Sequence, residues 1–322
     1  MFQMKRKALV PLLCFLLGIL NSAQAETKNS LVMMTGGTAG VYYPLGNALT
    51  RILNAHLADV EIAVEVGGGS IANVNRIAAH EAAMGLVQND VVFRAGRGDK
   101  PFREPVTNLR MIASLYPEQV QCITSKNGRV KTFSDIRGKR VSVGAPGSGV
   151  ADSLGAILSV AGIKYSDMDT DFLDFADTAE RLQHDRLDVG FVLAGYPTAV
   201  VASLAEQKEI DLVAFESELL DALVESYPYF VKDSIPAGTY KGVDHDTPVP
   251  AVMAVLVCDA DLPEELVYGI TKAIFEHLDE LKPIHEKAKA ISLETALEGA
   301  SVAVHPGAAK YYAENGLEIP EL

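Results

Sequence analysis

The pattern that most constrains the fold of this chain is a short apolar strand that runs into a glycine-rich turn at a helix start. It occurs first in residues 31–46, LVMMTGGTAGVYYPLG, where an amphipathic segment begins at Val41. Similar turns follow at Gly67–Ser70, Gly144–Gly149 and Gly195–Pro197. Glycine lets the backbone approach a bound group, and the free N–H groups of a helix start favour an anion. The pattern predicts either a small-anion site or a set of tight connections without a ligand.

Between these turns, short apolar strands alternate with helical segments, as in strands 59–66, 83–88 and 251–258 and helix 263–281. This alternation is typical of α/β proteins with mainly parallel sheets. Ligands of such sheets lie beyond the carboxyl ends of the strands. Two of the turns lie in the first third of the chain and two in the middle third, which favours one cleft between two domains.

Several local expectations follow from the same reading. Residues 94–108 carry many charges without periodicity and are expected to form a surface loop. Residues 109–115 and 120–124 are expected to be two strands separated by a proline-containing segment. Residues 170–175 are expected to form a strand, with the next helix over 178–186.

The first 25 residues have the pattern of a cleaved signal peptide. Basic residues 5–7 precede an apolar run of about thirteen residues, 8–20, which is shorter than the ~20 residues that span a bilayer. Residues 23–25, Ala-Gln-Ala, form an A-x-A cleavage site. We expect cleavage after Ala25 and a periplasmic location.

The chain is acidic, with a net charge of -14, and removing the three positive charges of the signal gives -14 - 3 = -17. Such a charge argues against binding nucleic acid or an anionic membrane surface. An anionic ligand would therefore have to be held by local donors against an unfavourable overall field.

Two cysteines, Cys122 and Cys258, follow the expected cleavage site. An oxidising compartment permits a disulfide between them. Each lies in an apolar, strand-like run, so two buried free thiols are an equally good reading. Neither has the neighbours of a zinc site.

The glycine turns lack the residues that would make them catalytic. Residues 144–149 have the spacing of half a P-loop, but Val150 and Ala151 stand where Lys and Ser or Thr are needed. Neither Ser70 nor Ser148 lies in a G-x-S-x-G motif. No histidine pair has metal-ligand spacing. The sequence therefore predicts a binding protein, with no enzyme activity, metal or cofactor.

Five polar residues at strand ends and helix starts have two readings each. The hydroxyls of Thr38, Ser70 and Ser148 could cap their helices or contact a ligand. Gln88 ends a buried strand, where its amide could bond to neighbouring backbone or face the cleft. Asp90 could hold an ammonium group or cap the segment that follows.

Longer motifs, kept in order over residues 32–317, carry a resemblance to a known family. The chain resembles the TAXI family, the TRAP-associated extracytoplasmic solute-binding proteins. The resemblance rests on TGGTAGVYYPLGNAL, GGGSIANV, LVQND, ASLYPE, GKRVSVGAPGSGV, AGYPTA, YPYF with IPAGTY, LPEELVY, ALEG and HPGA.

This resemblance implies a type II-like periplasmic binding protein with two α/β lobes, each a mainly parallel sheet flanked by helices, joined by a two-strand hinge. Lobe 1 would be residues 30–120 plus 251–322, and lobe 2 residues 121–250. The receptor, expected to be a monomer, would bind 2-oxoglutarate, glutamate or a related dicarboxylate. It would deliver this ligand to a sodium-coupled TRAP permease in the membrane.

The resemblance also implies the ligand contacts, residue by residue. The family usually has glycine where Ala39 stands and often threonine near Val150, so the ligand's identity is left open at both turns. The implied contacts are Thr38, Gly40, Tyr42, Ser70, Asn73, Gln88 and Asp90 in lobe 1, Ser148, Gly149, Gly195 and Pro197 in lobe 2, and Tyr116 near the hinge.

Two other functions are compatible with the same motifs. A two-lobed binding protein can serve as the ligand-sensing partner of a membrane-bound kinase or chemoreceptor. An exported α/β enzyme is the third reading, against which stands the lack of an evident nucleophile, base or metal.

Overall fold

The computed structural model describes residues 29–321, so the expected signal peptide lies outside the described residues. Strands and helices alternate along the first part of this range. They are β1 (Asn29–Thr35), α1 (Tyr42–His56), β2 (Val60–Val66), α2 (Ser70–Ala78), β3 (Met84–Gln88), α3 (Asn89–Arg97), β4 (Leu109–Ser125), η1 (Phe133–Ile136), β5 (Arg140–Ser142) and α4 (Gly149–Val160).

The second part returns through the same sheet and ends in helices. Its elements are η2 (Tyr165–Asp167), β6 (Asp169–Asp171), α5 (Phe175–Gln183), β7 (Val189–Ala194), α6 (Ala199–Gln207), β8 (Ile210–Leu212), α7 (Ser217–Ser226), β9 (Val231–Ile235), β10 (Thr247–Asp259), α8 (Glu264–Glu276), α9 (Leu278–Leu281), η3 (Glu286–Ala290) and α10 (Pro306–Glu314).

The described strands form one sheet in the order β2-β1-β3-β10-β4-β7-β5-β6, with β8 paired to β4 and β9 to β10. The outer strands β2, β1 and β3 are parallel, as are β7, β5 and β6. The long strands β4 and β10 run antiparallel to each other and to their neighbours. The expected mainly parallel sheet is therefore found only at the outer strands, because the two long strands that join them make the sheet mixed.

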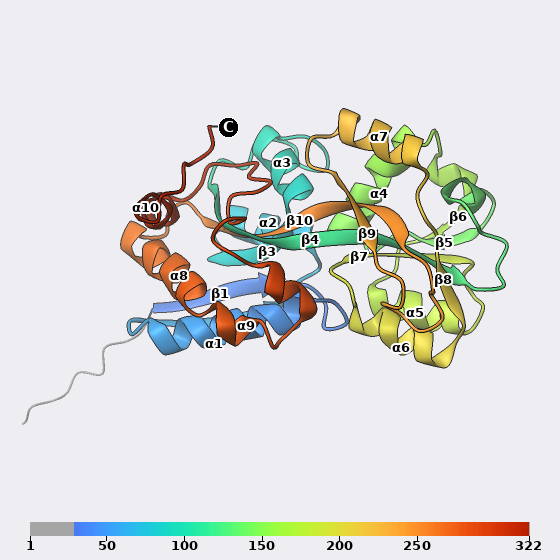
Figure 1. The fold of residues 1–322 in the computed structure, drawn as a ribbon. Helices are drawn as coiled ribbons and strands as arrows, with labels where there is room; N and C mark the ends of the chain where they lie inside the picture. The colour runs from blue at the N-terminus through green and yellow to red at the C-terminus, as the bar shows by residue number, and fades with distance from the viewer. Residues whose placement is uncertain (1–28, 322) are drawn as a thin grey trace, which may run out of the picture.

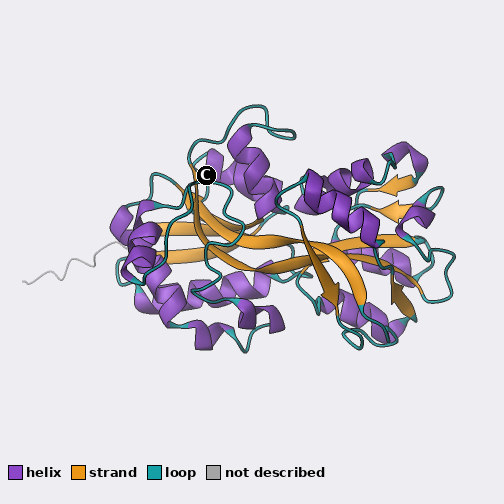
Figure 2. Ribbon diagram, turned by 45° about the horizontal axis from the view of Figure 1, so that its top comes forward, coloured by secondary structure: helices purple, strands orange, loops and turns teal. Residues whose placement is uncertain are grey.

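The predicted two-lobed α/β architecture is confirmed (Figure 1). One lobe carries β1–β3 with α1, α2, α3, α8 and α10, and the other carries β5–β8 with α4–α7. Strands β4 and β10 run through both lobes, and helices lie on both sides of the strands (Figure 2). The largest cluster of buried apolar side chains includes members from both lobes.

Three local predictions were wrong, each for a physical reason. The expected loop 94–108 begins inside helix α3, whose buried Val91 and Val92 anchor it and which ends at the left-handed Gly98 (φ 71°). The two expected strands 109–115 and 120–124 are the single strand β4, because pairing with β10 continues through Pro117, which lies opposite Met253, and the register shifts lie at Leu115 and Ile112. The expected strand 170–175 ends at Asp171 and the expected helix 178–186 starts at Phe175, because Asp174 caps the helix by accepting a bond from Asp177 N at 2.8 Å.

Cys122 and Cys258 are free thiols, buried in β4 and β10. Burial raises the pKa of both thiols, since a thiolate is poorly solvated in the core. Within residues 29–321, each helix is too short or too polar to cross a bilayer.

Candidate ligand-binding site

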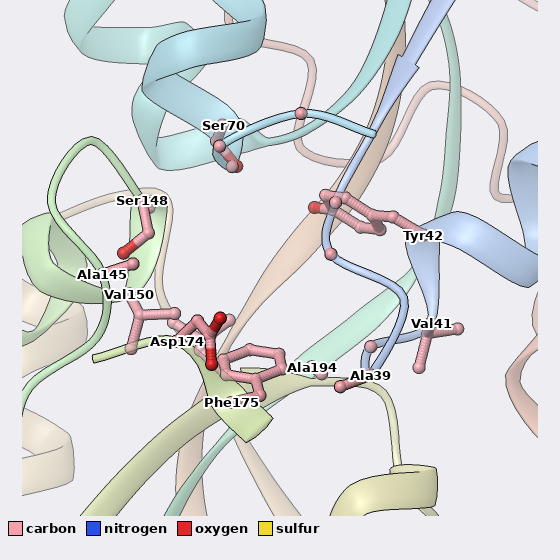
Figure 3. Close-up of a pocket in the computed structure, with 18 of the residues that line it drawn as sticks. Ala39, Val41, Tyr42, Ser70, Ala145, Ser148, Val150, Asp174, Phe175 and Ala194 are labelled. Atoms are coloured by element: carbon pink, nitrogen blue, oxygen red, sulfur yellow. The ribbon is translucent and has the colours of Figure 1, made fainter. Parts of the chain in front are cut away.

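Three of the four glycine turns meet at one cleft between the lobes, with a volume of about 370 Å³ (Figure 3). The turn before α1 and the turn before α2 form one wall, and the turn before α4 faces them from the other lobe. The lining residues are Gly36, Gly37, Thr38, Ala39, Gly40, Val41, Tyr42, Val66, Gly67, Gly68, Gly69, Ser70, Gln88, Glu118, Ala145, Pro146, Ser148, Gly149, Val150, Asp174, Phe175, Ala176, Leu193 and Ala194.

The start of helix α5 forms the fourth side of the cleft, and the glycine pattern did not predict this. Asp174 and Phe175, at the start of α5, line it in place of the turn 195–197 (Figure 3). The Phe175 ring lies so close to the first lobe that a Cβ on Gly40 would be 3.3 Å from it. The start of α5 contains no glycine. Its sequence signal is Asp174, three residues before Asp177, a spacing that suits a helix cap.

The helix starts at the cleft differ in how their N–H groups are satisfied. Helix α4 is capped by the Ser148 hydroxyl, which accepts from Ala151 N at 3.4 Å, and α5 is capped by Asp174. Helices α1 and α2 have no side-chain cap bond among the described residues, and in the first turn of α2 one N–H group, that of Ala72, donates to the carbonyl oxygen of Gly147 at 3.3 Å. Uncapped helix starts present free N–H groups and the positive end of the helix dipole. An anionic group therefore fits best against the wall formed by α1 and α2.

Seven of the twelve predicted contact residues line the cleft, namely Thr38, Gly40, Tyr42, Ser70, Gln88, Ser148 and Gly149. Of the three hydroxyl residues with two readings, Ser148 acts as a cap. Ser70 does not: its Oγ accepts from Gln88 N at 3.1 Å. Thr38 is exposed in the turn before α1.

Asn73 and Asp90 lie behind the lining instead of in it. The Asn73 side chain donates to the carbonyl oxygens of Thr35 (3.1 Å) and Leu86 (2.9 Å), which ties the ends of β1 and β3 together. Asp90 is fully buried and accepts a 2.5 Å bond from Ser153 of the other lobe. Both predicted residues thus support the cleft wall or join the lobes.

The other three predicted residues, Tyr116, Gly195 and Pro197, do not line the cleft. Tyr116 is fully buried in β4, and the Cβ position of Gly195 is 3.1 Å from its ring. The carbonyl oxygen of Pro197 lies 2.9 Å from Nε2 of His285. Because Lys287 also packs against Gly195, this turn contacts η3 and its neighbours instead of facing the cleft.

The two lobes touch closely across the cleft. A Cβ on Gly149 would lie 1.5 Å from the Oε1 of Gln88, so only glycine leaves room for that side chain. Ala72 N donates to the carbonyl oxygen of Gly147 at 3.3 Å. The lining therefore depends on a closed arrangement of the lobes.

Sequence reasoning missed Glu118, which lines the cleft from β4 with only 2% of its surface exposed. Tyr42 Oη donates to its Oε2 at 2.6 Å. Burial, together with the nearby charge of Asp90, raises the pKa of Glu118 to about 8. The signal that could have found it is a lone carboxylate between two apolar strand-like runs, 109–115 and 120–124.

A second group of buried charges joins α3 of one lobe to α4 of the other. Arg94 donates to Asp152 at 3.1 Å and to the Tyr229 hydroxyl at 3.0 Å. Burial and the charge of Asp90 raise the pKa of Asp152 to about 7, while Arg94 opposes this shift. We refer to Asp90, Arg94, Asp152, Ser153 and Tyr229 as the Arg94 cluster.

The charge of the cleft itself is one-sided. Over the described residues its lining contains two carboxyl groups, those of Glu118 and Asp174, and no lysine, arginine or histidine. Donors to a ligand are therefore backbone N–H groups and the hydroxyl and amide groups of its neutral side chains. No described lining residue combines with another into a nucleophile and base pair.

Three solved bacterial structures illustrate the similarity in fold. The alkanesulfonate-binding protein SsuA from Xanthomonas axonopodis pv. citri, bound to MOPS, is 13% identical over 84% of this chain and 86% of its own, with a TM-score of 0.52. A putative L-cystine ABC transporter from Listeria monocytogenes is 14% identical over 82% and 98%, with a TM-score of 0.51.

A third structure comes from the glutathione import system of Streptococcus mutans, which involves GshT and the cystine ABC importer TcyBC. It is 9% identical over 83% of this chain and 97% of its own, with a TM-score of 0.53. At these identities the three structures share the fold alone. A family model matches residues 33–316, and the chain therefore belongs to the NMT1-like family.

Proposed function

We propose that this protein is a periplasmic solute receptor that binds a small organic acid or acidic amino acid, such as 2-oxoglutarate or glutamate. The observation that carries the proposal is the meeting of two uncapped helix starts, those of α1 and α2, at a 370 Å³ cleft between two lobes. Free N–H groups at helix starts hold a carboxylate without a cationic side chain. The cleft is of a size that suits a small molecule.

The seven lining residues of the predicted set are the proposed ligand contacts. Ser70, Tyr42 and Gln88 offer polar side chains from lobe 1, and Ser148 and Gly149 face them from lobe 2. Asn73 and Asp90 are proposed to act indirectly, by fixing the wall behind these contacts.

Lobe 1 is proposed to be residues 30–120 plus 251–322 and lobe 2 residues 121–250, with β4 and β10 as the hinge. The lobes then close around the ligand by bending of these two strands. Closure requires that the ligand bind the closed form better than the open one. Small-angle scattering with and without ligand is expected to show a smaller radius of gyration when the ligand is bound.

The proposed partner is a sodium-coupled TRAP permease, because the motifs of the TAXI resemblance run in order through nearly the whole chain after the expected signal. An ABC importer is the second candidate, since similar folds occur in the cystine and glutathione import systems described above. Uptake into vesicles that hold the cognate membrane subunits distinguishes them. A sodium gradient drives uptake in the first case and ATP hydrolysis in the second.

The ligand class is tested with protein unfolded and refolded to remove any bound molecule. Thermal shift and calorimetry against C4 and C5 acids and amino acids are expected to show at least one ligand of submillimolar affinity or better. Native mass spectrometry of freshly purified protein gives an independent identification. No response to the whole panel, with no retained small molecule, would contradict the proposal.

A further inference from the structure

Glu118 is a buried acid without a cation among the side chains that line the cleft. The residue is 2% exposed, and the titratable groups that act on it are Tyr42, Tyr116 and Asp90. None of these supplies a positive charge. An ionised carboxylate in such a place is strongly disfavoured unless it is paired. Either the group stays protonated, or a bound molecule brings the missing cation.

When Glu118 is ionised, Glu118 and Gln88 both offer acceptors in the cleft lining, and the Tyr116 hydroxyl beside Glu118 is a donor without a partner among the described residues. Tyr42 donates one bond to Oε2 of Glu118 at 2.6 Å. The Oε1 of Gln88, a residue that lines the same cleft and is 3% exposed, has no partner among the described residues. Buried polar atoms are nearly always satisfied in a functioning state of a protein. A ligand that carries N–H groups would satisfy these acceptors, whereas a ligand with only carboxylates would not.

The charge balance of the cleft favours the same ligand. A dicarboxylate would bring two negative charges to a lining that has Glu118 and Asp174 and, over the described residues, no basic side chain. An α-amino acid brings its own ammonium group beside its carboxylate. The carboxylate can lie at the uncapped starts of α1 and α2 while the ammonium turns to the acids.

We propose that Glu118 binds the ammonium group of an α-amino acid, so that the ligand is zwitterionic instead of a plain dicarboxylate. This inference rests on the proposed function and narrows its ligand class. Tyr42 holds the carboxylate in position, and Glu118 sets the preference for an amine. No covalent bond changes on binding.

The proposal includes a proton balance. With a pKa raised to about 8, Glu118 is mostly protonated at pH 7 in the free protein. Pairing with an ammonium group requires the carboxylate, so binding releases this proton to solvent. The released amount is expected to approach one proton at pH 7, and affinity is expected to rise with pH up to about 8.

The experiment compares amino acids with analogues that lack the amino group, on refolded, ligand-free protein. Glutamate against its 2-oxo analogue, 2-oxoglutarate, is the central pair, with aspartate against succinate beside it. Calorimetry at pH 7, in buffers of different ionisation enthalpy, gives the affinity and the protons exchanged. The best-binding amino acid is expected to bind at least about 10-fold more tightly than its oxo analogue, since a site built for a polar group rejects a ligand that lacks it.

The decisive variant is Glu118→Gln, which keeps the shape and an acceptor for Tyr42 but removes the charge. It is expected to weaken amino-acid binding at least about 30-fold and to abolish proton release. Glu61→Gln is the matched control, because Glu61 is exposed on β2. Thermal unfolding of each variant shows that it is folded before binding is measured.

The outcomes separate the inference from the function on which it rests. If 2-oxoglutarate or succinate binds as tightly as the amino acids, or if protons are taken up, Glu118 does not bind an ammonium and only the inference fails. If no member of the panel binds, both the inference and the proposed function fail. Unchanged amino-acid affinity in Glu118→Gln also overturns the inference.

Discussion

Two groups of buried acids lie at the boundary between the lobes, and they differ in one respect. The Arg94 cluster contains its own cation, which donates to Asp152 of the opposite lobe. Glu118 has a tyrosine donor and no cation among its described neighbours. A buried carboxylate with an internal cation is paired once the lobes close, whereas one without a cation stays protonated until a cation from outside the protein pairs with it.

The two groups of acids indicate how different residues at one cleft can control closure of the lobes and recognition of the ligand. Contacts of the Arg94 cluster cross between α3 and α4 and depend on the lobes being together. The Glu118 carboxyl group faces the cleft and in our proposal depends on the ligand. If this division is right, substitutions in the Arg94 cluster weaken all ligands alike, and substitutions at Glu118 change which ligand is preferred.

The largest expected effect concerns stability and pH at Glu118. Its pKa in the folded protein, about 8, lies above the ordinary value of 4.5. Because the pKa is raised on folding, Glu118 contributes fully to the free energy of unfolding below about pH 4.5, and this contribution is lost as pH rises through 8. The loss is on the order of 4 kcal/mol over that window. Urea unfolding of the ligand-free protein at pH 5, 6, 7 and 8 measures it.

In the Glu118→Gln variant this part of the pH dependence is expected to disappear. The difference in the free energy of unfolding between variant and wild type is clearest between pH 7 and 8. Asp152 has a pKa of about 7 and loses most of its own contribution to that free energy below this range. Glu61→Gln should follow the wild-type curve. Equal slopes for Glu118→Gln and wild type between pH 7 and 8 would show that Glu118 is already ionised in the free protein.

The second prediction removes the cation of the other group. Arg94→Met leaves Asp90 and Asp152 without a positive partner and breaks two bonds that cross the lobes. The two side chains of the pair are 17% and 12% exposed, so loss of one member costs up to about 3 kcal/mol, and every ligand should bind up to about 100-fold more weakly. Calorimetry with two different ligands measures the change. Arg97→Met, an exposed arginine on the same helix, is the control.

A change in the ratio of the two ligand affinities, without a common loss, would contradict the assignment of Arg94 to closure. Small-angle scattering adds a second readout. The ligand-free Arg94→Met variant is expected to have a larger radius of gyration than the Arg97→Met control.

A third variant hinders closure of the lobes without a change of charge. In Gly149→Ala the new Cβ would lie 1.5 Å from Gln88 Oε1, which belongs to the opposite lobe. Gln88 must move or the lobes must separate, and ligand affinity is expected to fall about 10-fold, or ~1.4 kcal/mol. Gly155→Ala on the same helix meets only the Tyr165 hydroxyl at 3.6 Å and should bind normally. Equal affinities in the two variants would show that the ligand-bound lobes stand farther apart than in this structure.

The sequence predicted the parts of the cleft that depend on local backbone chemistry. Glycines before a helix have a local cause, so the turns before α1, α2 and α4 could be placed without knowing the fold. The turn 195–197 has the same local pattern but lies against η3, because only the register of the sheet decides which strand ends share a cleft. The start of α5 lines the cleft instead, and no glycine in that segment predicts this.

The charged groups could not be assigned from sequence for a related reason. Glu118 is one carboxylate among 42 Asp and Glu residues, and its burial comes from the pairing of β4 with β10. Arg94 was placed in an expected surface loop, whereas it belongs to α3 and reaches residues 58 and 135 positions away. Long-range pairing of this kind leaves no periodic signal in the chain.

The smallest expected change in ligand affinity comes from removing one hydroxyl group of the Arg94 cluster. Tyr229→Phe removes the 3.0 Å bond from Arg94 but keeps the aromatic ring, whose centroid lies 5.7 Å from the guanidinium carbon. Loss of one hydrogen bond to a charged group, with the stacking retained, is expected to weaken every ligand by about 1 kcal/mol, or roughly 5-fold. Tyr227→Phe is the matched control. The Tyr227 ring stacks on the Tyr229 ring, but Arg94 donates to the Tyr229 hydroxyl, so only Tyr229→Phe removes the bond.

Calorimetry on both variants with the same two ligands measures the difference in affinity. A larger loss for Tyr229→Phe than for Arg94→Met would mean that Tyr229, and not the Arg94–Asp152 pair, holds the lobes closed.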